Sequence, residues 1–276
     1  MGLFSGCLLA SDIDGTIESN GIISPRTIEK IAYFISEGGK FSLSTGRTAP
    51  AVKDVLSRVD NIAPSVLANG AVIYDFCENR VLWEASVPKE DLELVLEVYN
   101  SFPEMGIELH TAHQVFNLRS NDEIRDHAFY EHLEPLPISP DELYGKRFNK
   151  ILYASDNPAE LNRLRDFVNI SVHNSVFRDT SAQLGGRKRS YLEQLPGKAS
   201  KGSGCRKLIE LLGIEKGGYF AIGDYYNDLD MILDSDIGCF TADAPEELQK
   251  QADFVAGFAS EGAVADFIDY LAKLRS

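Results

Sequence analysis

The chain has 276 residues, and its 42 acidic and 27 basic side chains give a formal net charge of -15 at pH 7. A composition of 44% hydrophobic and 25% charged residues excludes a disordered chain, and at roughly 100 to 200 residues per domain the length predicts one large or two modest domains. The negative charge argues against nucleic acid or an anionic membrane as a partner, because both would repel the chain. A small anionic substrate would need a local cation.

The spacing of the cysteines and the lack of long apolar runs predict a cytoplasmic protein. The cysteines form no CxxC or Cys/His pattern, so we expect reduced thiols. No run approaches the ~18 apolar residues of a membrane span, and the N-terminus lacks the basic flank and apolar stretch of a signal peptide. The four cysteines lie far apart, at Cys7, Cys77, Cys205 and Cys239.

The first part of the chain predicts alternating strands and helices. Residues 7–10 form an apolar run that is too short for a helix and suits a strand buried on both faces. Ser24 and Pro25 then open a helix, as a capping residue before a proline at the first helical position. Further strands at 40–44 and 64–68, with a helix between them, complete a βαβ pattern, which predicts a parallel sheet covered by helices.

The same alternation returns near the C-terminus. Residues 218–222 form an apolar strand, and shorter strands are predicted at 237–240 and 254–255, each separated from the next by a helix. The two ends of the chain therefore predict one interrupted sheet.

The middle of the chain, from about residue 88 to residue 189, has a different pattern. Predicted helices at 90–100 and 159–168 alternate with stretches of period-two patterning, such as 107–110. This pattern predicts an α+β insert. A basic cluster at 185–189 is interpreted as a solvated turn, and a patch that meets an anionic substrate is the alternative.

All five histidines lie in this insert. His110 and His113 have strand or turn spacing without a third ligand, so we expect no metal site there. The five are His110, His113, His127, His132 and His173.

Asp12 and Asp14 follow the first predicted strand, at the sheet edge where ligand crevices form. Two carboxylates two residues apart point to similar sides of an extended backbone, and their repulsion is tolerable only beside a cation or with one proton bound. Mg²⁺ prefers such oxygen ligands. The alternative is a turn in which the aspartates and a glycine merely end the strand.

A second acidic pair, Asp224 and Asp228, follows the strand at 218–222. Alone it would be interpreted as a helix N-terminus with acids favoured by the dipole. Two acidic clusters at two strand ends instead favour one shared shell of oxygen ligands with Asp12.

Two further strand-edge or loop features favour anion binding. Thr45, Gly46 and Arg47 offer a hydroxyl and backbone amides at a strand end, although a plain turn is the alternative. Lys201 precedes an apolar helix, where a fixed ammonium could hold carboxylate and phosphoryl oxygens. Lys198 is its nearby competitor.

In this order, the four pieces resemble the motifs of the haloacid dehalogenase-like phosphohydrolases. Residues 12–16 resemble motif I, 45–47 motif II, 201–202 motif III and 223–228 motif IV. The insert, together with residues 68–71, resembles the Cof-type (subclass IIB) members, which carry an α/β cap.

The resemblance implies an α/β fold, with a Rossmann-like core of parallel sheet flanked by helices and an inserted α+β cap of the C2 type. Residues 1–86 and 190–276 would form the catalytic core, and 87–189 the cap. Asp243 stands where the family usually has asparagine, which leaves the catalytic set unchanged.

The resemblance also implies residue roles. Asp12 would attack phosphorus to form an aspartyl-phosphate, and Asp14 would serve as acid and then base. Mg²⁺ would be held by Asp12, the backbone carbonyl of Asp14 and Asp224, with Asp228 and Asn227 orienting this shell. The remaining implied roles are a phosphoryl hydrogen bond from Thr45, charge balance by Lys201, and phosphate or substrate contacts from Ile13, Gly46, Arg47, Asn69 and Asn227.

The implied function is a Mg²⁺-dependent phosphatase for a small phosphorylated metabolite, such as a sugar phosphate. The alternatives are a phosphomutase of the phosphomannomutase type and a non-catalytic module that retains the fold. Cap closure would select the substrate. Candidate selecting contacts are Asn69, Arg119, Arg178 and Arg187, and no oligomeric state is predicted.

Overall fold

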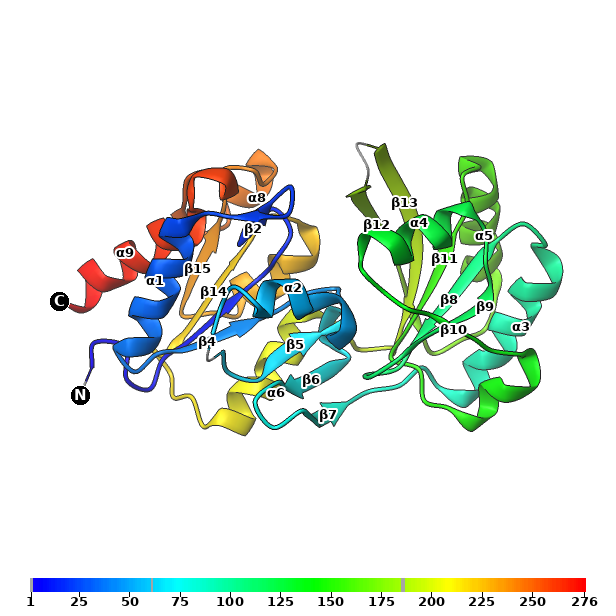
Figure 1. Ribbon diagram of the computed structural model, residues 1–276, viewed down its shortest axis with the longest axis horizontal. Helices are drawn as coiled ribbons and strands as arrows, with labels where there is room; N and C mark the ends of the chain where they lie inside the picture. The colour runs from blue at the N-terminus through cyan, green and yellow to red at the C-terminus, as the bar shows by residue number, and fades with distance from the viewer. Residues whose placement is uncertain (1, 61, 185–186) are drawn as a thin grey trace. The chain divides into compact units, whose positions relative to one another are not determined.

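The computed structural model describes residues 2–60, 62–184 and 187–276, and the side chains of residues 181–188 lie outside the description. The chain divides into two compact units (Figure 1). Unit 1 consists of Met1–Arg47, Lys53–Trp83 and Ser200–Ser276, and unit 2 of Thr48–Val52 and Glu84–Ala199.

Unit 1 is built on a five-stranded parallel sheet in the order β16-β15-β14-β1-β4. β1 lies between β14 and β4, and Ser11 at its end lies opposite Ile222 of β14 and Leu43 of β4. The prediction that both ends of the chain share one sheet is therefore confirmed. The strands are β1 (Leu8–Ser11), β4 (Lys40–Leu43), β14 (Tyr219–Gly223), β15 (Ile237–Phe240) and β16 (Phe254–Val255).

Helices flank this sheet (Figure 1). α1 begins as predicted, because the Ser24 side chain accepts the backbone N–H of Thr27 at 3.1 Å and Pro25 occupies the first helical position. α1 packs against α9, and α6 packs against α7. The helices are α1 (Pro25–Ser36), α2 (Lys53–Leu56), α6 (Lys201–Leu212), α7 (Leu229–Leu233), α8 (Glu246–Gln249) and α9 (Ala263–Arg275).

The strand predicted at 64–68 has different partners from those expected. It is β5 (Ser65–Leu67), which pairs antiparallel with β6 (Val72–Asp75) in a separate sheet that β7 (Arg80–Glu84) completes. Backbone φ angles of 50° at Asn69 and 93° at Gly70 reverse the chain between β5 and β6. One parallel bridge, between residues 44 and 66, links β5 to the end of β4.

The segments after the first and second predicted strands are short. β2 (Glu18–Ser19) and β3 (Ile22–Ile23) form a small antiparallel pair. In place of the single helix expected between the strands at 40–44 and 64–68, the structure has a 3-10 segment, Ala49–Val52, followed by the short helix α2. Other 3-10 segments in the described ranges are Ala68–Gly70, Lys89–Asp91, Pro140–Gly145, Tyr226–Asp228 and Ala259–Glu261.

Unit 2 is an α+β arrangement, as predicted for the middle of the chain. Its six-stranded sheet has the order β10-β9-β8-β11-β13-β12. In β8, Ile107 and Leu109 join the main apolar core with α3 and α5, while the alternate residues face the side on which Ile124 of α4 packs. The elements are β8 (Gly106–His110), β9 (Val115–Arg119), β10 (Leu136–Pro137), β11 (Lys150–Ala154), β12 (Val176–Leu184), β13 (Arg187–Leu195), α3 (Leu92–Ser101), α4 (Asp122–Tyr130) and α5 (Pro158–Ile170).

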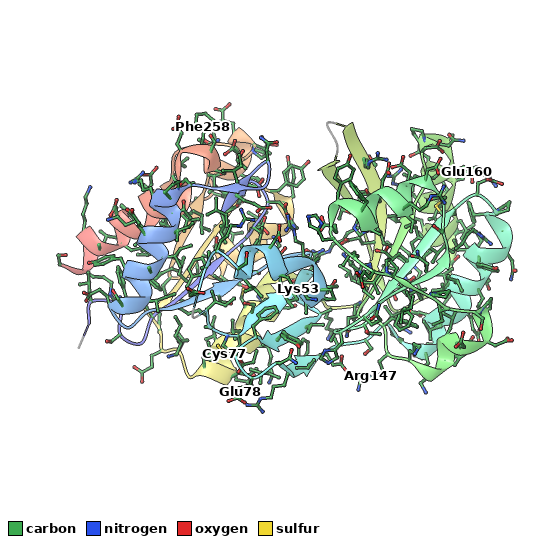
Figure 2. All side chains as sticks on the ribbon, in the orientation of Figure 1. Lys53, Cys77, Glu78, Arg147, Glu160 and Phe258 are labelled. Carbon is green, nitrogen blue, oxygen red and sulfur yellow. The ribbon has the colours of Figure 1, made fainter. Side chains whose placement is uncertain are left out.

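The four cysteines are free thiols, in agreement with the prediction. Three of them are buried, and Cys77 is exposed in the turn between β6 and β7 (Figure 2). Within the described ranges, the helices are too short or too polar to cross a bilayer.

Candidate active site

The ends of three adjacent strands bring the predicted motifs to one edge of the unit 1 sheet. Asp12 follows β1, Thr45 comes two residues after the end of β4, and Asp224 follows β14. The backbone N–H of Asp12 donates to the carbonyl of Ile222 at 3.0 Å, which ties the ends of β1 and β14 together. Parallel pairing therefore places these residues close together although they are far apart in sequence.

We define the acid cluster as Asp12, Asp224, Asp228 and Lys201. Each aspartate offers a carboxylate oxygen, and these oxygens all lie within 4.8 Å of one another. The Nζ of Lys201, the first residue of α6, lies 2.6 Å from Oδ1 of Asp12 and 2.6 Å from Oδ1 of Asp228. The three carboxylates thus lie beside a single ammonium, which contacts two of them, and this leaves a surplus of negative charge.

Burial and mutual repulsion shift the pKa values in this cluster. Burial raises the pKa of Asp12 to about 7, against the opposing effect of Lys201. Burial, with the charges of Asp12 and Asp228, raises the pKa of Asp224 to about 9. Burial acts to lower the pKa of Lys201, but Asp12 and Asp228 outweigh it and raise that pKa. The oxygen donors and their surplus charge fit a hard divalent cation, which would relieve the repulsion.

Two glycines allow the acidic side chains to approach the backbone. Gly15 has a φ of 75°, and a Cβ there would lie 2.3 Å from Oδ2 of Asp224. A Cβ at Gly223 would lie 2.3 Å from Cγ of Asp228. Any larger residue at either position would displace a carboxylate of the acid cluster.

Asp228 is held by hydrogen bonds on both carboxylate oxygens. Its Oδ2 accepts the backbone N–H groups of Asp224 and Tyr225, each at 3.0 Å, while Oδ1 faces Lys201. The side chain therefore fixes the loop that carries Asp224. Asp228 would therefore orient Asp224 as a metal ligand through this loop.

The remaining motif residues surround this cluster. Thr45 is buried, and its hydroxyl accepts the backbone N–H of Arg47 at 3.2 Å. Asn227 donates from Nδ2 to Oδ1 of Asn69 at 3.4 Å. A Cβ at Gly46 would lie 3.1 Å from Nδ2 of Asn69, so motif II closely approaches that amide.

The structure distinguishes between Lys201 and Lys198, which the sequence left as alternatives for the same role. Lys201 has no exposed surface and makes both contacts to the acid cluster, whereas Lys198 is exposed. The carbonyl of Ile13 accepts backbone N–H groups of residues 16, 17 and 18, so this atom is occupied by the loop itself.

Arg47 contacts carboxylates of its own unit. Its Nε donates to Oδ2 of Asp14 at 3.0 Å, and its Nη2 lies 2.5 Å from Oδ1 of Asp14 and 2.7 Å from Oε1 of Glu18. Glu18 is a residue that sequence reasoning missed. An isolated glutamate after motif I carries no local signal, because its burial and its partner arise only from the tertiary fold.

Two of the arginines considered as selecting contacts bond within unit 2. Arg119 donates from Nη1 to the carbonyl of Phe102 at 2.7 Å and lies over the ring of Tyr99. Arg178 donates to the carbonyl of Ala199 at 3.0 Å. The side chain of Arg187 lies outside the described residues.

The prediction of a solvated basic turn is wrong at Arg189. This residue is buried, and its guanidinium lies 2.6 Å from Glu123 and 2.5 Å from Asp126, both in α4. It stands inside β13, which pairs along its length with β12, so the side chain is directed by the sheet and not by a turn. Residues 185 and 186 and the side chains of residues 187 and 188 lie outside the described part.

Comparison with known proteins agrees with this geometry. The model of the haloacid dehalogenase-like hydrolase family matches residues 9–268. The 5-amino-6-(5-phospho-D-ribitylamino)uracil phosphatase YwtE of Bacillus subtilis is 27% identical over 287 residues, covering 95% of this chain and 97% of that protein.

Solved structures show the same fold. A haloacid dehalogenase-like hydrolase from Bacteroides thetaiotaomicron has a TM-score of 0.80 at 21% identity, over 96% of this chain and 99% of that one. A haloacid dehalogenase subclass IIB sugar phosphatase has a TM-score of 0.77 at 18% identity, over 96% and 98% of the two chains. The family resemblance, the α/β fold and the enzyme class predicted from the sequence, a phosphatase of this family, are confirmed.

Proposed function

The chain belongs to the haloacid dehalogenase-like hydrolases, and from this membership we propose that it is a Mg²⁺-dependent phosphatase acting on a small phosphorylated metabolite, such as a sugar phosphate. One observation carries the proposal: three carboxylates offer oxygens that lie within 4.8 Å of one another, beside a single buried lysine that contacts two of them. The relative named as a 5-amino-6-(5-phospho-D-ribitylamino)uracil phosphatase and the solved structure named as a sugar phosphatase support this substrate class.

Asp12 is the proposed nucleophile. Its Oδ1 contacts the ammonium of Lys201, and its second oxygen would attack phosphorus. A bond then forms between that oxygen and phosphorus while the ester bond to the leaving group breaks, giving an aspartyl-phosphate and an alkoxide. Asp14 donates the proton that the alkoxide takes up.

Water completes the reaction. It attacks phosphorus in the aspartyl-phosphate, and the ionised Asp14 accepts its proton. The bond between Asp12 and phosphorus breaks, which releases inorganic phosphate and restores the carboxylate of Asp12 and the protonated Asp14. Thr45 would hydrogen-bond a phosphoryl oxygen, and Lys201 would balance charge at Asp12 throughout.

The acid cluster provides the site for Mg²⁺. Asp12, Asp224 and the backbone carbonyl of Asp14 would hold the ion, and Asp228 would orient them. When bound, Mg²⁺ supplies positive charge that withdraws electron density from the phosphoryl oxygens and suppresses their repulsion by the nucleophile.

The roles of the two parts of the chain belong to the same proposal. Unit 1 would form the catalytic core, and unit 2, whose sheet includes β13 up to Leu195, a cap that selects the substrate and excludes water during turnover. Asn69, Gly46 and Asn227 would contact the bound phosphate or substrate. A cytoplasmic location stays a prediction.

Phosphate release from a panel of small monoesters, with and without Mg²⁺, tests the proposed function. Wild type should release phosphate only with the metal, and Asp12→Asn should show no turnover while it keeps a native circular dichroism spectrum. Asp54→Asn, which changes an exposed carboxylate on α2, serves as the control and should behave as wild type.

Two results would count against the proposal. Release by Asp12→Asn at the wild-type rate would exclude Asp12 as the nucleophile. No release from any ester would exclude the phosphatase and lead to phosphomutase assays with a bisphosphate activator.

A further inference from the structure

Glu18 is a buried carboxylate next to the proposed active site. It is the first residue of β2 and is only 5% exposed. One of its oxygens lies 2.7 Å from Nη2 of Arg47, and the other lies 3.4 Å from Nη2 of Arg58. Because a buried glutamate is costly unless it is paired, this ion pair explains how the residue is accommodated.

Arg47 connects Glu18 to Asp14. The same Nη2 atom contacts Glu18 and Oδ1 of Asp14, while Nε donates to Oδ2 of Asp14. The contact to Asp14 is therefore bidentate, which fixes the plane of the carboxylate as well as its position. The Asp14 side chain is 61% exposed, so burial does not determine its orientation.

The backbone holds both ends of this arrangement. The N–H of Glu18 donates to the carbonyl of Ile13 at 3.0 Å, and the carbonyl of Glu18 accepts the N–H of Gly15 at 2.9 Å. The carbonyl of Arg47 accepts the N–H of Ala68 at 2.9 Å. Glu18 and Arg47 thus extend from segments anchored at the same edge of the sheet as Asp12.

We propose that Glu18 is a positioning residue, which holds the guanidinium of Arg47 so that Arg47 keeps Asp14 in the orientation from which it protonates the leaving group. This inference rests on the proposed function, in which Asp14 is the general acid. Without Glu18, the guanidinium would lose its buried partner and the orientation of Asp14 would no longer be fixed. Misplaced general acids lose part of a contribution of about 10²- to 10⁴-fold.

The dependence of kcat/KM on the leaving group tests this role. p-Nitrophenolate departs as a stable anion and needs no proton, whereas an alkoxide does, and kcat/KM reports the steps up to that departure. Glu18→Gln should lower kcat/KM by about 10-fold or more for a sugar phosphate and by less than about 3-fold for p-nitrophenyl phosphate. The ratio of the two values from one preparation does not depend on the folded fraction.

Four further variants make the test specific. Asp14→Asn should show the same selective loss for the sugar phosphate. Adding Glu18→Gln to Arg47→Met should change the ratio no further, because Glu18 acts through Arg47. Asp269→Asn, which removes a carboxylate paired with two cations elsewhere in unit 1, should leave the ratio unchanged.

Glu18→Asp keeps a buried charge and replaces Glu18→Gln if the latter does not fold. It should show a smaller loss with the same selectivity, because the shorter side chain retreats from Arg47. Equal losses on both substrates in the Glu18 variants, or an effect that persists without Arg47, would overturn the positioning role. A selective loss in Asp14→Asn but not in the Glu18 variants would refute the positioning role of Glu18 and leave the proposed function standing. No selective loss in Asp14→Asn would refute Asp14 as the general acid, on which both the positioning role and the proposed mechanism depend.

Discussion

Each unit of the molecule contains a buried group of ionisable side chains, and the two groups differ in charge balance. The acid cluster of unit 1 has three carboxylates and one ammonium. In unit 2, the histidine cluster consists of Glu108, His110 and His127: one carboxylate oxygen of Glu108 lies 2.8 Å from Nε2 of His110 and 3.0 Å from Nδ1 of His127. The acid cluster has more anions than cations, whereas in the histidine cluster two histidines contact the single carboxylate.

The pKa shifts follow from this difference. Burial raises the pKa of Asp12 to about 7, because the single charge of Lys201 does not outweigh burial and the neighbouring anions Asp228 and Asp14. Burial also acts to raise the pKa of Glu108, but the two histidines outweigh it, and the pKa lies well below its ordinary value. Equal burial therefore has opposite results, and the neighbouring charges decide which group requires a cation from outside.

The largest expected effect is the loss of Lys201. Lys201→Ala should lower kcat by about 10² or more and destabilise the fold by about 3–5 kcal/mol, because it leaves two buried carboxylates without their ammonium. Lys198→Ala, at an exposed position three residues earlier, should change neither. Steady-state kinetics and urea unfolding of both variants measure the difference, and the reverse ranking would refute the proposed role of Lys201.

Mg²⁺ should stabilise unit 1 by satisfying the surplus negative charge. At 100 times its dissociation constant, the ion should add about 2.7 kcal/mol, visible as a higher melting temperature. Asp224→Asn should remove most of this gain. A metal response that is unchanged in this variant would show that Mg²⁺ binds elsewhere.

The same cluster sets the pH dependence without metal. The pKa of Asp224 rises from 3.8 to about 9, so the folded state binds more protons than the unfolded state between these values. The contribution of this group to stability is complete below pH 3.8 and is lost as the pH rises to about 9. Stabilisation by Mg²⁺ should therefore grow with pH, since the ion replaces that proton, and melting curves from pH 6 to pH 9 would detect it.

The smallest expected effect concerns the histidine cluster. Burial, with the nearby charge of Lys150, lowers the pKa of His110 from 6.5 to about 4. The folded state therefore binds fewer protons than the unfolded state in this range, and stability should fall as the pH drops from 6.5 to about 4. Between pH 6.5 and pH 4, the melting temperature of His110→Gln should fall by roughly 5 °C less than that of the wild type. His113→Gln, at an exposed site, should show the same fall as the wild type. A fall in melting temperature that is unchanged in His110→Gln would contradict the neutral, buried state of His110.

Much of the fold could be predicted because short sequence patterns determine many of its strands and helices. The apolar run before Asp12 and the capping pair Ser24 and Pro25 predicted β1 and α1, and the structure contains both. β5 was misplaced because its partners depend on the reversal at Asn69 and Gly70, which a propensity pattern does not contain. Strand character is local, whereas strand pairing is not.

The candidate site was predictable to the extent that its residues occur in short motifs. Asp12, Thr45, Lys201 and Asp224 could be chosen from such motifs, and the fold brings their segments to one sheet edge. Glu18 and Arg189 could not be interpreted in this way, because each depends on a partner distant in sequence: Arg47 for the former and Glu123 for the latter.

The sequence by itself determined the alternation of strands and helices, the two kinds of architecture along the chain and the motif residues, because periodicity and residue chemistry are properties of short segments. Only the tertiary structure decided which lysine meets the carboxylates, which partner Arg47 takes and which acidic residues are buried. Burial and charge pairing depend on side chains that the folded chain brings together from distant positions.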